Sequence, residues 1–210
     1  MDLSTIQLLV VVAVIIISMT LHEIAHGYTA FWLGDQTPKA QGRLSLNPLK
    51  HLDPFMSVLL PLLLAIAGGP IFGGAKPVQV NPLRLKWGEW GMALVAIAGP
   101  VINFIIAFTA FGFLYHLGPH VSDFWNLVMA LFVQINLGFM IFNLLPIPPL
   151  DGSRVLYALA PSFIQDVMQR IERFGVLVVM ALVLLFSPFI FAIMSNAINL
   201  ILSFFFWVVS

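Results

Sequence analysis

Apolar runs separated by polar stretches dominate the chain. The apolar segments are 3–33, 55–67, 92–117, 124–145, 176–186 and 189–209. A helix needs about 20 residues to cross a bilayer, so the first, third, fourth and last segments are long enough to span one. Segment 55–67 is short and contains Pro61, and only Ser187 and Pro188 separate the last two segments. Those last two segments fit either a broken hairpin or two separate spans.

The composition indicates a membrane protein. Hydrophobic residues make up 60% of the 210 residues and charged residues 9%, whereas a soluble domain has roughly 25% charged residues. The formal net charge is zero, and no basic run indicates nucleic-acid binding. The chain has no cysteine, so a metal site would need histidine and carboxylate ligands. No basic residue precedes the first apolar run, which favours a permanent span over a signal peptide.

Basic residues are unevenly distributed among the polar connections. These connections are 34–53, 73–89, 116–123 and 151–173. Each carries three Lys or Arg residues except 116–123, which carries none, and neither terminus has one. The positive-inside tendency then puts three connections in the cytoplasm, with the N-terminus and 116–123 outside.

The number of crossings constrains segment 55–67. If the first helix runs inward and the 92–117 and 124–145 helices run out and back, 55–67 cannot cross alone. It must enter the membrane and return, with the Gly- and Pro-rich 68–82 stretch as its return limb. Irregular backbone at membrane depth is tolerated only where protein or a water-filled cavity satisfies it. We therefore predict a re-entrant, extended membrane-associated loop beside a water-accessible site.

The expected fold is an all-α polytopic membrane protein with about five to six transmembrane helices. The re-entrant loop lies between the first span and the span that carries Gly-Pro-x-x-Asn at 99–103. One membrane-embedded domain, 1–210, accounts for the chain. Its catalytic core covers about 3–159, and a C-terminal helical hairpin covers about 174–209.

A His-Glu-x-x-His run begins at His22 in the first apolar segment. His22 and His26 are four positions apart, so on a helix they share one face and both imidazoles can reach one ion. Glu23 can approach a water at the metal without ligating the metal, as a general base requires. The alternative is a chance match with packed histidines. Ionisable residues are costly within a bilayer, which favours the functional interpretation.

A catalytic zinc usually has three protein ligands and one open position. His51, His116, His120 and several carboxylates are candidates for the third ligand, but the crossing count puts His116 and His120 on the opposite side. Asp151 follows three prolines, which end the preceding helix and allow its carboxylate to turn toward the site. Gly152 gives the backbone room there. The alternative role for Asp151 is an ordinary N-cap of the next helix.

Three segments make the chain resemble the site-2 protease family of membrane-embedded zinc metalloproteases, in its small prokaryotic form without PDZ or regulatory domains. They are HEIAH at 22–26, AGPVIN at 98–103 and NLLPIPPLDG at 143–152. The resemblance implies one zinc ion bound by His22, His26 and Asp151, with Glu23 as the catalytic base. It also implies an endopeptidase that hydrolyses peptide bonds in or near transmembrane segments of membrane proteins. The expected roles are regulated intramembrane proteolysis, or clearance of membrane proteins and signal peptides.

The resemblance implies substrate contacts as well. Asn143 is expected to contact the substrate backbone or to help polarise the scissile carbonyl. Residues 74–82 look like the extended loop of the small prokaryotic members, and such a loop can pair with an unwound substrate as a strand. The expected substrate-binding residues in this loop are Gly74, Lys76, Pro77 and Val78.

Asn103, Gly152 and His51 are candidate supporting residues. Asn103 fits a helix–helix hydrogen bond better than a direct catalytic role. His51, together with Asp53, fits either an accessory pair near the metal or, more simply, a turn before the re-entrant segment.

The expected partners are the transmembrane segment of a substrate and the lipid bilayer, without nucleic acid, and a homo-oligomer is compatible with the sequence. We expect a multi-pass protein of a prokaryotic cell membrane, with the N-terminus outside and the active site near the cytoplasmic face. The alternative function is a non-proteolytic binding protein or metal carrier of the same fold. A pure binder has no need of Glu23, so the presence of Glu23 favours catalysis.

Overall fold

The computed structural model describes residues 3–53 and 76–210, and every regular element within them is helical. The long helices are α1 (Leu3–Trp32), α4 (Glu89–Leu117), α5 (Asp123–Asn143) and α8 (Val176–Val209). The shorter elements are α2 (Thr37–Ala40), η1 (Pro48–Lys50), η3 (Pro82–Arg84), η4 (Gly118–His120), α6 (Asp151–Leu159) and α7 (Ser162–Glu172). The all-α class expected from the sequence is confirmed for this part of the chain.

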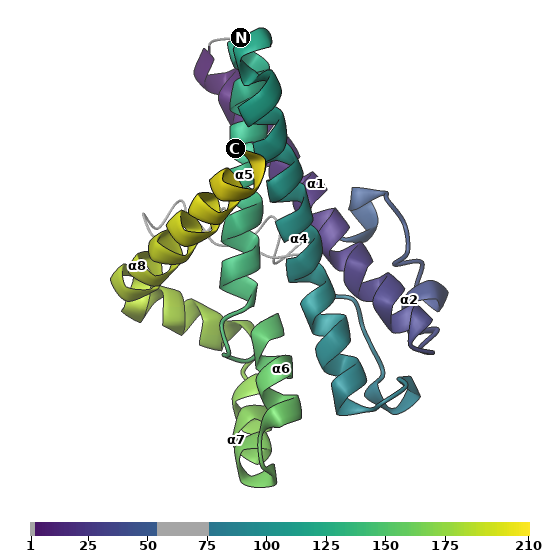
Figure 1. Cartoon of the computed structure of the whole chain (residues 1–210). Coiled ribbons are helices and arrows are strands. Elements are labelled where there is room, and N and C mark those ends of the chain that lie inside the picture. The colour runs from purple at the N-terminus through teal and green to yellow at the C-terminus, as the bar shows by residue number, and fades with distance from the viewer. Residues whose placement is uncertain (1–2, 54–75) are drawn as a thin grey trace.

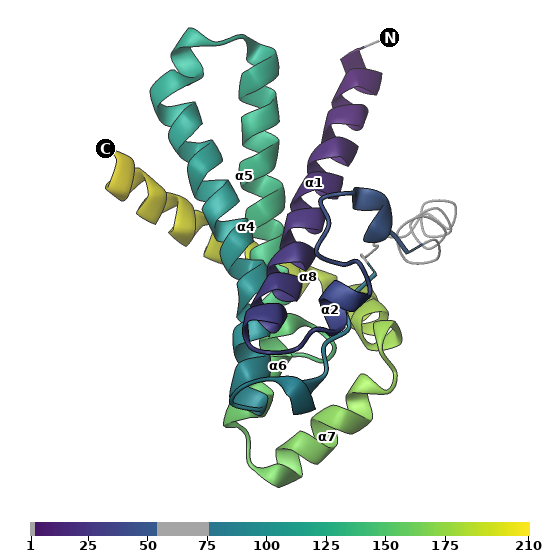
Figure 2. The same ribbon diagram turned by 90° about the vertical axis from the view of Figure 1, so that its right-hand side faces the viewer.

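Helix α4 is the centre of the fold, because it packs against α1, α5 and α6. Small buried residues such as Ala93, Ala96 and Ala107 line α4 and allow neighbouring helices to approach closely. Figures 1 and 2 show the start of α1 and the α4–α5 turn at one end of the molecule. Helices α6 and α7 lie at the other end, and α2 lies beside the end of α1.

The C-terminal end of α8 packs against α4 and α5, and the three helices share a cluster of buried apolar residues. Phe205 is fully buried there, and its ring meets those of Phe104 and Phe108 edge to face at 5.3 and 5.0 Å between centroids. Edge-to-face contacts of this kind add attraction beyond the burial of apolar area. The rest of α8 is largely exposed and apolar, as a lipid-facing helix is.

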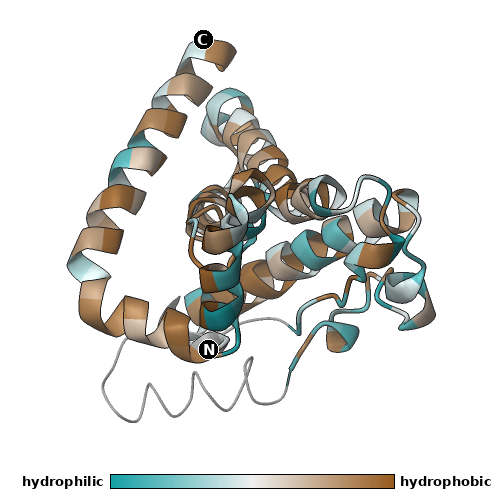
Figure 3. Ribbon diagram, turned by 90° about the horizontal axis from the view of Figure 1, so that it is seen from below, coloured by the Kyte–Doolittle hydropathy of each residue, from teal (hydrophilic) through white to brown (hydrophobic). Residues whose placement is uncertain are grey.

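Helix α8 is sharply kinked between the two apolar segments that the sequence separates at Ser187 and Pro188. Phe186 has non-helical backbone angles, φ −122° and ψ 15°, two residues before Pro188. Proline lacks an N–H, and its ring clashes with the carbonyl four residues earlier, so it bends a helix. Figure 3 shows the two limbs meeting at this bend without folding back on each other. The hairpin expected at 174–209 stays a prediction, and the structure shows two helical limbs joined at this bend.

Four helices of the described chain are long and apolar enough to cross a membrane. They are Thr5–Trp32, Glu89–His120, Asp123–Asn143 and Leu177–Val209. Segments 176–186 and 189–209 therefore make one candidate span, which is fewer than the two separate spans considered from the sequence. Segment 55–67 and the predicted re-entrant turn lie outside the described residues.

Residues 76–81 form an extended segment that is attached to the end of α1. The buried Asp35 carboxylate accepts hydrogen bonds from the N–H and hydroxyl of Thr37, at 3.0 and 2.6 Å, and from the Asn81 N–H at 2.7 Å. Burial opposes ionisation of Asp35, but these hydrogen bonds and the nearby Arg84 charge hold its pKa below the usual range. The ionised Asp35 thus fixes one end of the extended segment to the α1–α2 turn.

Candidate metal centre

His22 and His26 lie on one face of α1, as their spacing predicts. Both side chains are buried. Helix α1 continues from residue 26 to residue 32, which places His26 about 9 Å inside the end of the helix at 1.5 Å per residue. The pair therefore lies within the length of a candidate span, and not in a loop.

Asp151 reaches the histidines from the first turn of α6. Helix α5 ends at Asn143, and the proline-rich connection 144–150 turns the chain so that α6 packs against α4. A Cβ atom at Gly152 would lie 2.1 Å from the Leu144 carbonyl oxygen, so only glycine allows this approach. Leu150 occupies the N-cap position, and the capping role considered for Asp151 is not realised.

Three ligand atoms converge at this point. The Nε2 atoms of His22 and His26 are 2.9 Å apart, and Oδ2 of Asp151 lies 3.2 and 3.3 Å from them. Ligand atoms at about 2.0–2.1 Å from a tetrahedral zinc ion are separated by about 3.3 Å. The triangle therefore has the size that a zinc site requires, and it could hold a metal ion.

The protonation of His26 supports a cation in this triangle. Its Nδ1 lies 2.7 Å from the Val95 carbonyl oxygen, which can only accept, so Nδ1 carries the proton and donates it. In a neutral ring Nε2 then presents a lone pair to the triangle. The 2.9 Å approach of the two Nε2 atoms is therefore not a hydrogen bond if His22 is oriented in the same way.

A buried amide relay orients His22 in that way. The Asn136 Nδ2 donates to the Phe132 carbonyl at 2.8 Å, which leaves its Oδ1 to accept from Asn103 Nδ2 at 2.7 Å. Asn103 Oδ1 then faces His22 Nδ1 at 2.6 Å and accepts its proton. Both Nε2 lone pairs thus point at the Asp151 Oδ2, which is buried and has no hydrogen-bond donor among the described residues. Three lone pairs facing one point repel each other unless a cation lies between them, so the donor set fits zinc.

The relay joins three helices and gives Asn103 a definite role. Asn103 in α4, Asn136 in α5 and Ser18 in α1 are all fully buried, and Asn136 Nδ2 also donates to Ser18 Oγ at 2.8 Å. The sequence predicted a helix–helix hydrogen bond for Asn103, and its Nδ2 makes one with Asn136. Its Oδ1 has a further role, because it orients His22. Asn136 and Ser18 were not identified from the sequence. The position of Asn136 in the middle of an apolar span was the available signal.

We expect Asn103→Leu to lower the affinity for zinc by about 10- to 100-fold, because outer partners of metal-binding histidines contribute this much. The substitution keeps the side-chain volume but leaves His22 Nδ1 without its acceptor. The measurement is zinc retention of the purified protein in competition with a chelator. Asn196→Leu is the control, since Asn196 is an exposed asparagine of α8. Equal zinc affinity in both variants would show that the relay does not position His22.

Gly99 of α4 lies directly over the two imidazoles. A Cβ atom there would lie 2.5 Å from His22 Cε1 and 2.5 Å from His26 Nε2. These distances are well below van der Waals contact, so a side chain would enter the space between the rings and α4. Gly99 belongs to a motif noted in the sequence, but its role depends on contacts between helices that the sequence does not report.

Glu23 is buried beside the pair and faces the extended segment. Its Oε2 accepts a hydrogen bond from the Val78 N–H at 3.0 Å. Val78 also lies close to α1 at Gly27. A Cβ atom added at Gly27 would lie 3.8 Å from Val78 Cγ1, which is van der Waals contact. The Val78 N–H thus holds segment 76–81 against Glu23. The Asn81 N–H holds the same segment against Asp35, at the α1–α2 turn.

The other predicted site residues take different positions. Asn143 donates its Nδ2 to the Phe139 carbonyl of its own helix at 2.9 Å. His51 is fully buried, with its Nε2 2.7 Å from the Ser45 carbonyl, and its own carbonyl accepts from the Lys76 N–H at 2.8 Å. His51 therefore stabilises the turn before the extended segment and is not part of the ligand triangle. Lys76 and Pro77 are exposed in that segment, and Gly74 lies outside the described residues.

Comparison with known proteins gives a consistent result. The family described as Peptidase family M50 matches residues 118–186, which include Asp151. "Putative zinc metalloprotease YwhC" of Bacillus subtilis (strain 168) is 40% identical over 178 residues, 81% of this chain and 78% of that protein. "Putative zinc metalloprotease Rip2" of Mycolicibacterium smegmatis is 33% identical over 183 residues, 86% of this chain and 68% of that protein. No solved structure gives a significant match.

The apolar helices, the ligand triangle and these relatives together define a membrane zinc metalloprotease, an integral membrane protein whose cofactor is zinc. The chain belongs to peptidase family M50, the family of the site-2 proteases. The family resemblance and the zinc cofactor expected from the sequence are confirmed.

Proposed function

We propose that the protein is an intramembrane endopeptidase that hydrolyses peptide bonds in or near transmembrane segments of other membrane proteins. The position of the ligand triangle supports this proposal most directly. His22, His26 and Asp151 meet among helices that are long enough to span a bilayer, about 9 Å inside the end of α1. A substrate must therefore bring its backbone to membrane depth in order to reach the site.

We assign the zinc ligands as His22 Nε2, His26 Nε2 and Asp151 Oδ2, with Glu23 as the general base. Zinc bound there supplies a Lewis acid for the scissile carbonyl and lowers the pKa of a water to about 7. Glu23 takes the proton of the attacking water and later delivers it to the leaving amine. Its present hydrogen bond from Val78 N–H keeps the carboxylate turned toward the extended segment.

The extended segment at 76–81 is the proposed place of substrate pairing. Its residues Lys76 and Pro77 are exposed, and its backbone is extended, as strand pairing with an unwound substrate requires. Asn143, at the end of α5, is the proposed contact for the substrate backbone or the scissile carbonyl, which requires its side chain to leave the Phe139 carbonyl. The three basic connections favour an orientation in which this end of the molecule faces the cytoplasm.

The proposal is tested by reconstituting the purified protein in liposomes with single-span segments placed between soluble tags. We expect cleavage within or next to the apolar segment, mapped by mass spectrometry of both products. A zinc chelator should abolish the cleavage, and added zinc should restore it. Cleavage confined to the soluble tags would contradict an intramembrane role. Zinc binding or zinc passage without any cleavage would support the alternative, a metal carrier of the same fold.

A further inference from the structure

A pocket lies beside the end of α1, on a different side of this helix from the histidines. Its volume is about 410 Å³, and its lining residues are Tyr28, Phe31, Lys39, Gly42, Leu44, Ser45 and Lys50. Tyr28 follows His26 by two positions, a rotation of about 200° around the helix. The metal centre and this pocket therefore use different faces of α1, and nothing in the proposed reaction needs the pocket.

The pocket is positively charged. Residues 36–52 contain Lys39, Arg43 and Lys50 but no acidic residue. The ion pairs at Asp151 and Glu172 lie elsewhere in the described chain. The nearby Asp35 carboxylate is buried and bound to Thr37 and Asn81. Lys39 and Lys50 give this face a positive charge that can attract an external anion.

The walls of the pocket are held in place by internal hydrogen bonds. Arg43 is buried, and its guanidinium donates to the Lys50 carbonyl. His51 bonds the Ser45 carbonyl, and the Gly42 N–H donates to the Lys39 carbonyl at 3.0 Å. Because the backbone is fixed in this way, both lysines start from defined positions, and an anion does not have to order the loop.

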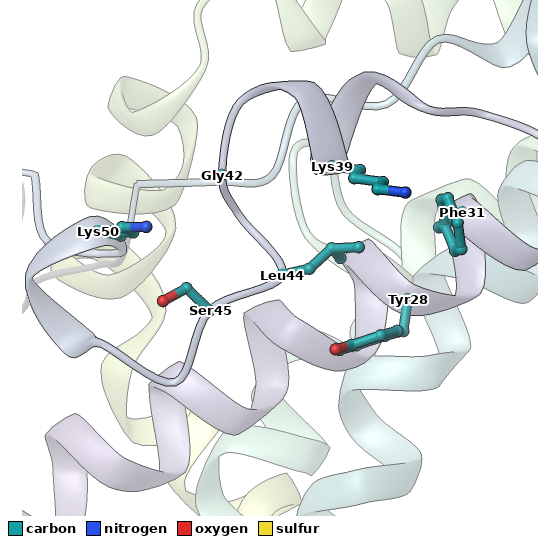
Figure 4. Close-up of a pocket in the computed structure, with 7 residues that line it drawn as sticks. All are labelled: Tyr28, Phe31, Lys39, Gly42, Leu44, Ser45 and Lys50. Carbon is teal, nitrogen blue, oxygen red and sulfur yellow. The ribbon is translucent and has the colours of Figure 1, made fainter.

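The lining side chains offer both charge and hydroxyl donors. Figure 4 shows Lys39 facing the Phe31 ring, and its Nζ lies 5.1 Å from the ring centroid. The Lys50 amine points toward Gly42 and lies 3.6 Å from the position of a Cβ atom there. The hydroxyls of Tyr28 and Ser45 lie on the same pocket. Ammonium and hydroxyl donors together suit the oxygens of a phosphate group.

The depth of the pocket indicates where that phosphate comes from. Tyr28 and Phe31 belong to the last turns of a candidate span that ends at Trp32. Trp32 is 72% exposed, and Leu46 and Leu49 beside the pocket are each 73% exposed. Aromatic residues at the end of a span lie at headgroup level, and exposed leucines there are suited to contact acyl chains. Lipid phosphates occupy this same level.

We propose that this pocket binds the phosphate of an anionic phospholipid headgroup. Lys39 and Lys50 provide the charge, and the Tyr28 and Ser45 hydroxyls provide further hydrogen bonds. The bound lipid holds the 37–51 turn against the bilayer at the end of α1.

The test is native mass spectrometry of the full chain in detergent, titrated with phosphatidylglycerol and, separately, with phosphatidylcholine. We expect preferential binding of phosphatidylglycerol. The double variant Lys39→Gln, Lys50→Gln should weaken this binding by about 30-fold, since each lysine near a lipid phosphate contributes about a factor of five. The control double variant Arg170→Gln, Arg173→Gln removes the same charge from exposed positions of α7 and just beyond it. Zinc content should stay equal in both variants.

A third arm adds inorganic phosphate to the phosphatidylglycerol complex. Failure of millimolar phosphate to displace the lipid supports a headgroup site. Displacement, with the same dependence on Lys39 and Lys50, would overturn the lipid assignment and identify a soluble phosphate as the ligand. Equal binding of both lipids, or an equal loss in the lysine and control variants, would overturn the site itself.

Discussion

Glu23→Gln is expected to lower peptide-bond hydrolysis by about 10²- to 10⁴-fold, the range for removal of a general base. Glutamine keeps the shape of the side chain and can still accept the Val78 N–H, so the extended segment should remain in place. It cannot accept the proton of the attacking water. Because Glu23 is not one of the three converging ligand atoms, zinc should remain bound.

The measurement is the single-turnover rate of cleavage in liposomes, with zinc content determined on the same preparation. Glu89→Gln is the matched control, since Glu89 is an exposed glutamate in the first turn of α4. We expect the control to cleave at the parental rate. A Glu23→Gln protein that cleaves as fast as the parent would remove Glu23 from the mechanism. One that loses zinc would make Glu23 a ligand instead of a base.

Gly99→Ala is expected to cost about 100-fold in zinc affinity, the upper end of the range for disturbing the surroundings of a metal ligand. The added methyl group would lie 2.5 Å from atoms of both His22 and His26, so the imidazoles must rotate away from Asp151. A local shift of this kind separates the three ligand atoms without removing any of them.

Gly112→Ala is the control for this substitution, because a Cβ atom at Gly112 of the same helix would meet nothing within 4 Å. Alanine favours a helix more than glycine by about 1 kcal/mol, so neither variant should weaken α4 itself. Zinc content, zinc affinity and helical circular dichroism are measured for both. Equal zinc affinities in the two variants would show that the imidazoles tolerate a side chain at position 99, and the close packing of α4 on the site would then have no role in metal binding.

The amino-acid sequence determined the class of the protein and two of the three candidate metal ligands. Segments of apolar residues long enough to span a bilayer are recognisable from length and composition alone. The pairing of His22 with His26 follows from the helical repeat, which depends on residues four positions apart. Asp151 could be nominated from the prolines before it, but its alternative as a helix cap could not be excluded from local pattern.

Only the tertiary structure decided how the rest of the centre is assembled. His22 and Asn103 are 81 positions apart, and Asn136 and Ser18 are 118 apart, yet both pairs are hydrogen-bonded. The approach of α6 depends on the lack of a side chain at Gly152, where a Cβ atom would lie 2.1 Å from the Leu144 carbonyl oxygen. The space over the imidazoles depends on Gly99 in the same way. The packing of the C-terminal limb of α8 on α4 through Phe205 is likewise a contact between distant segments. The helical repeat is set within a few positions, so the sequence shows which residues share a face of a helix. Contacts between helices depend on distances between backbones that no local pattern contains.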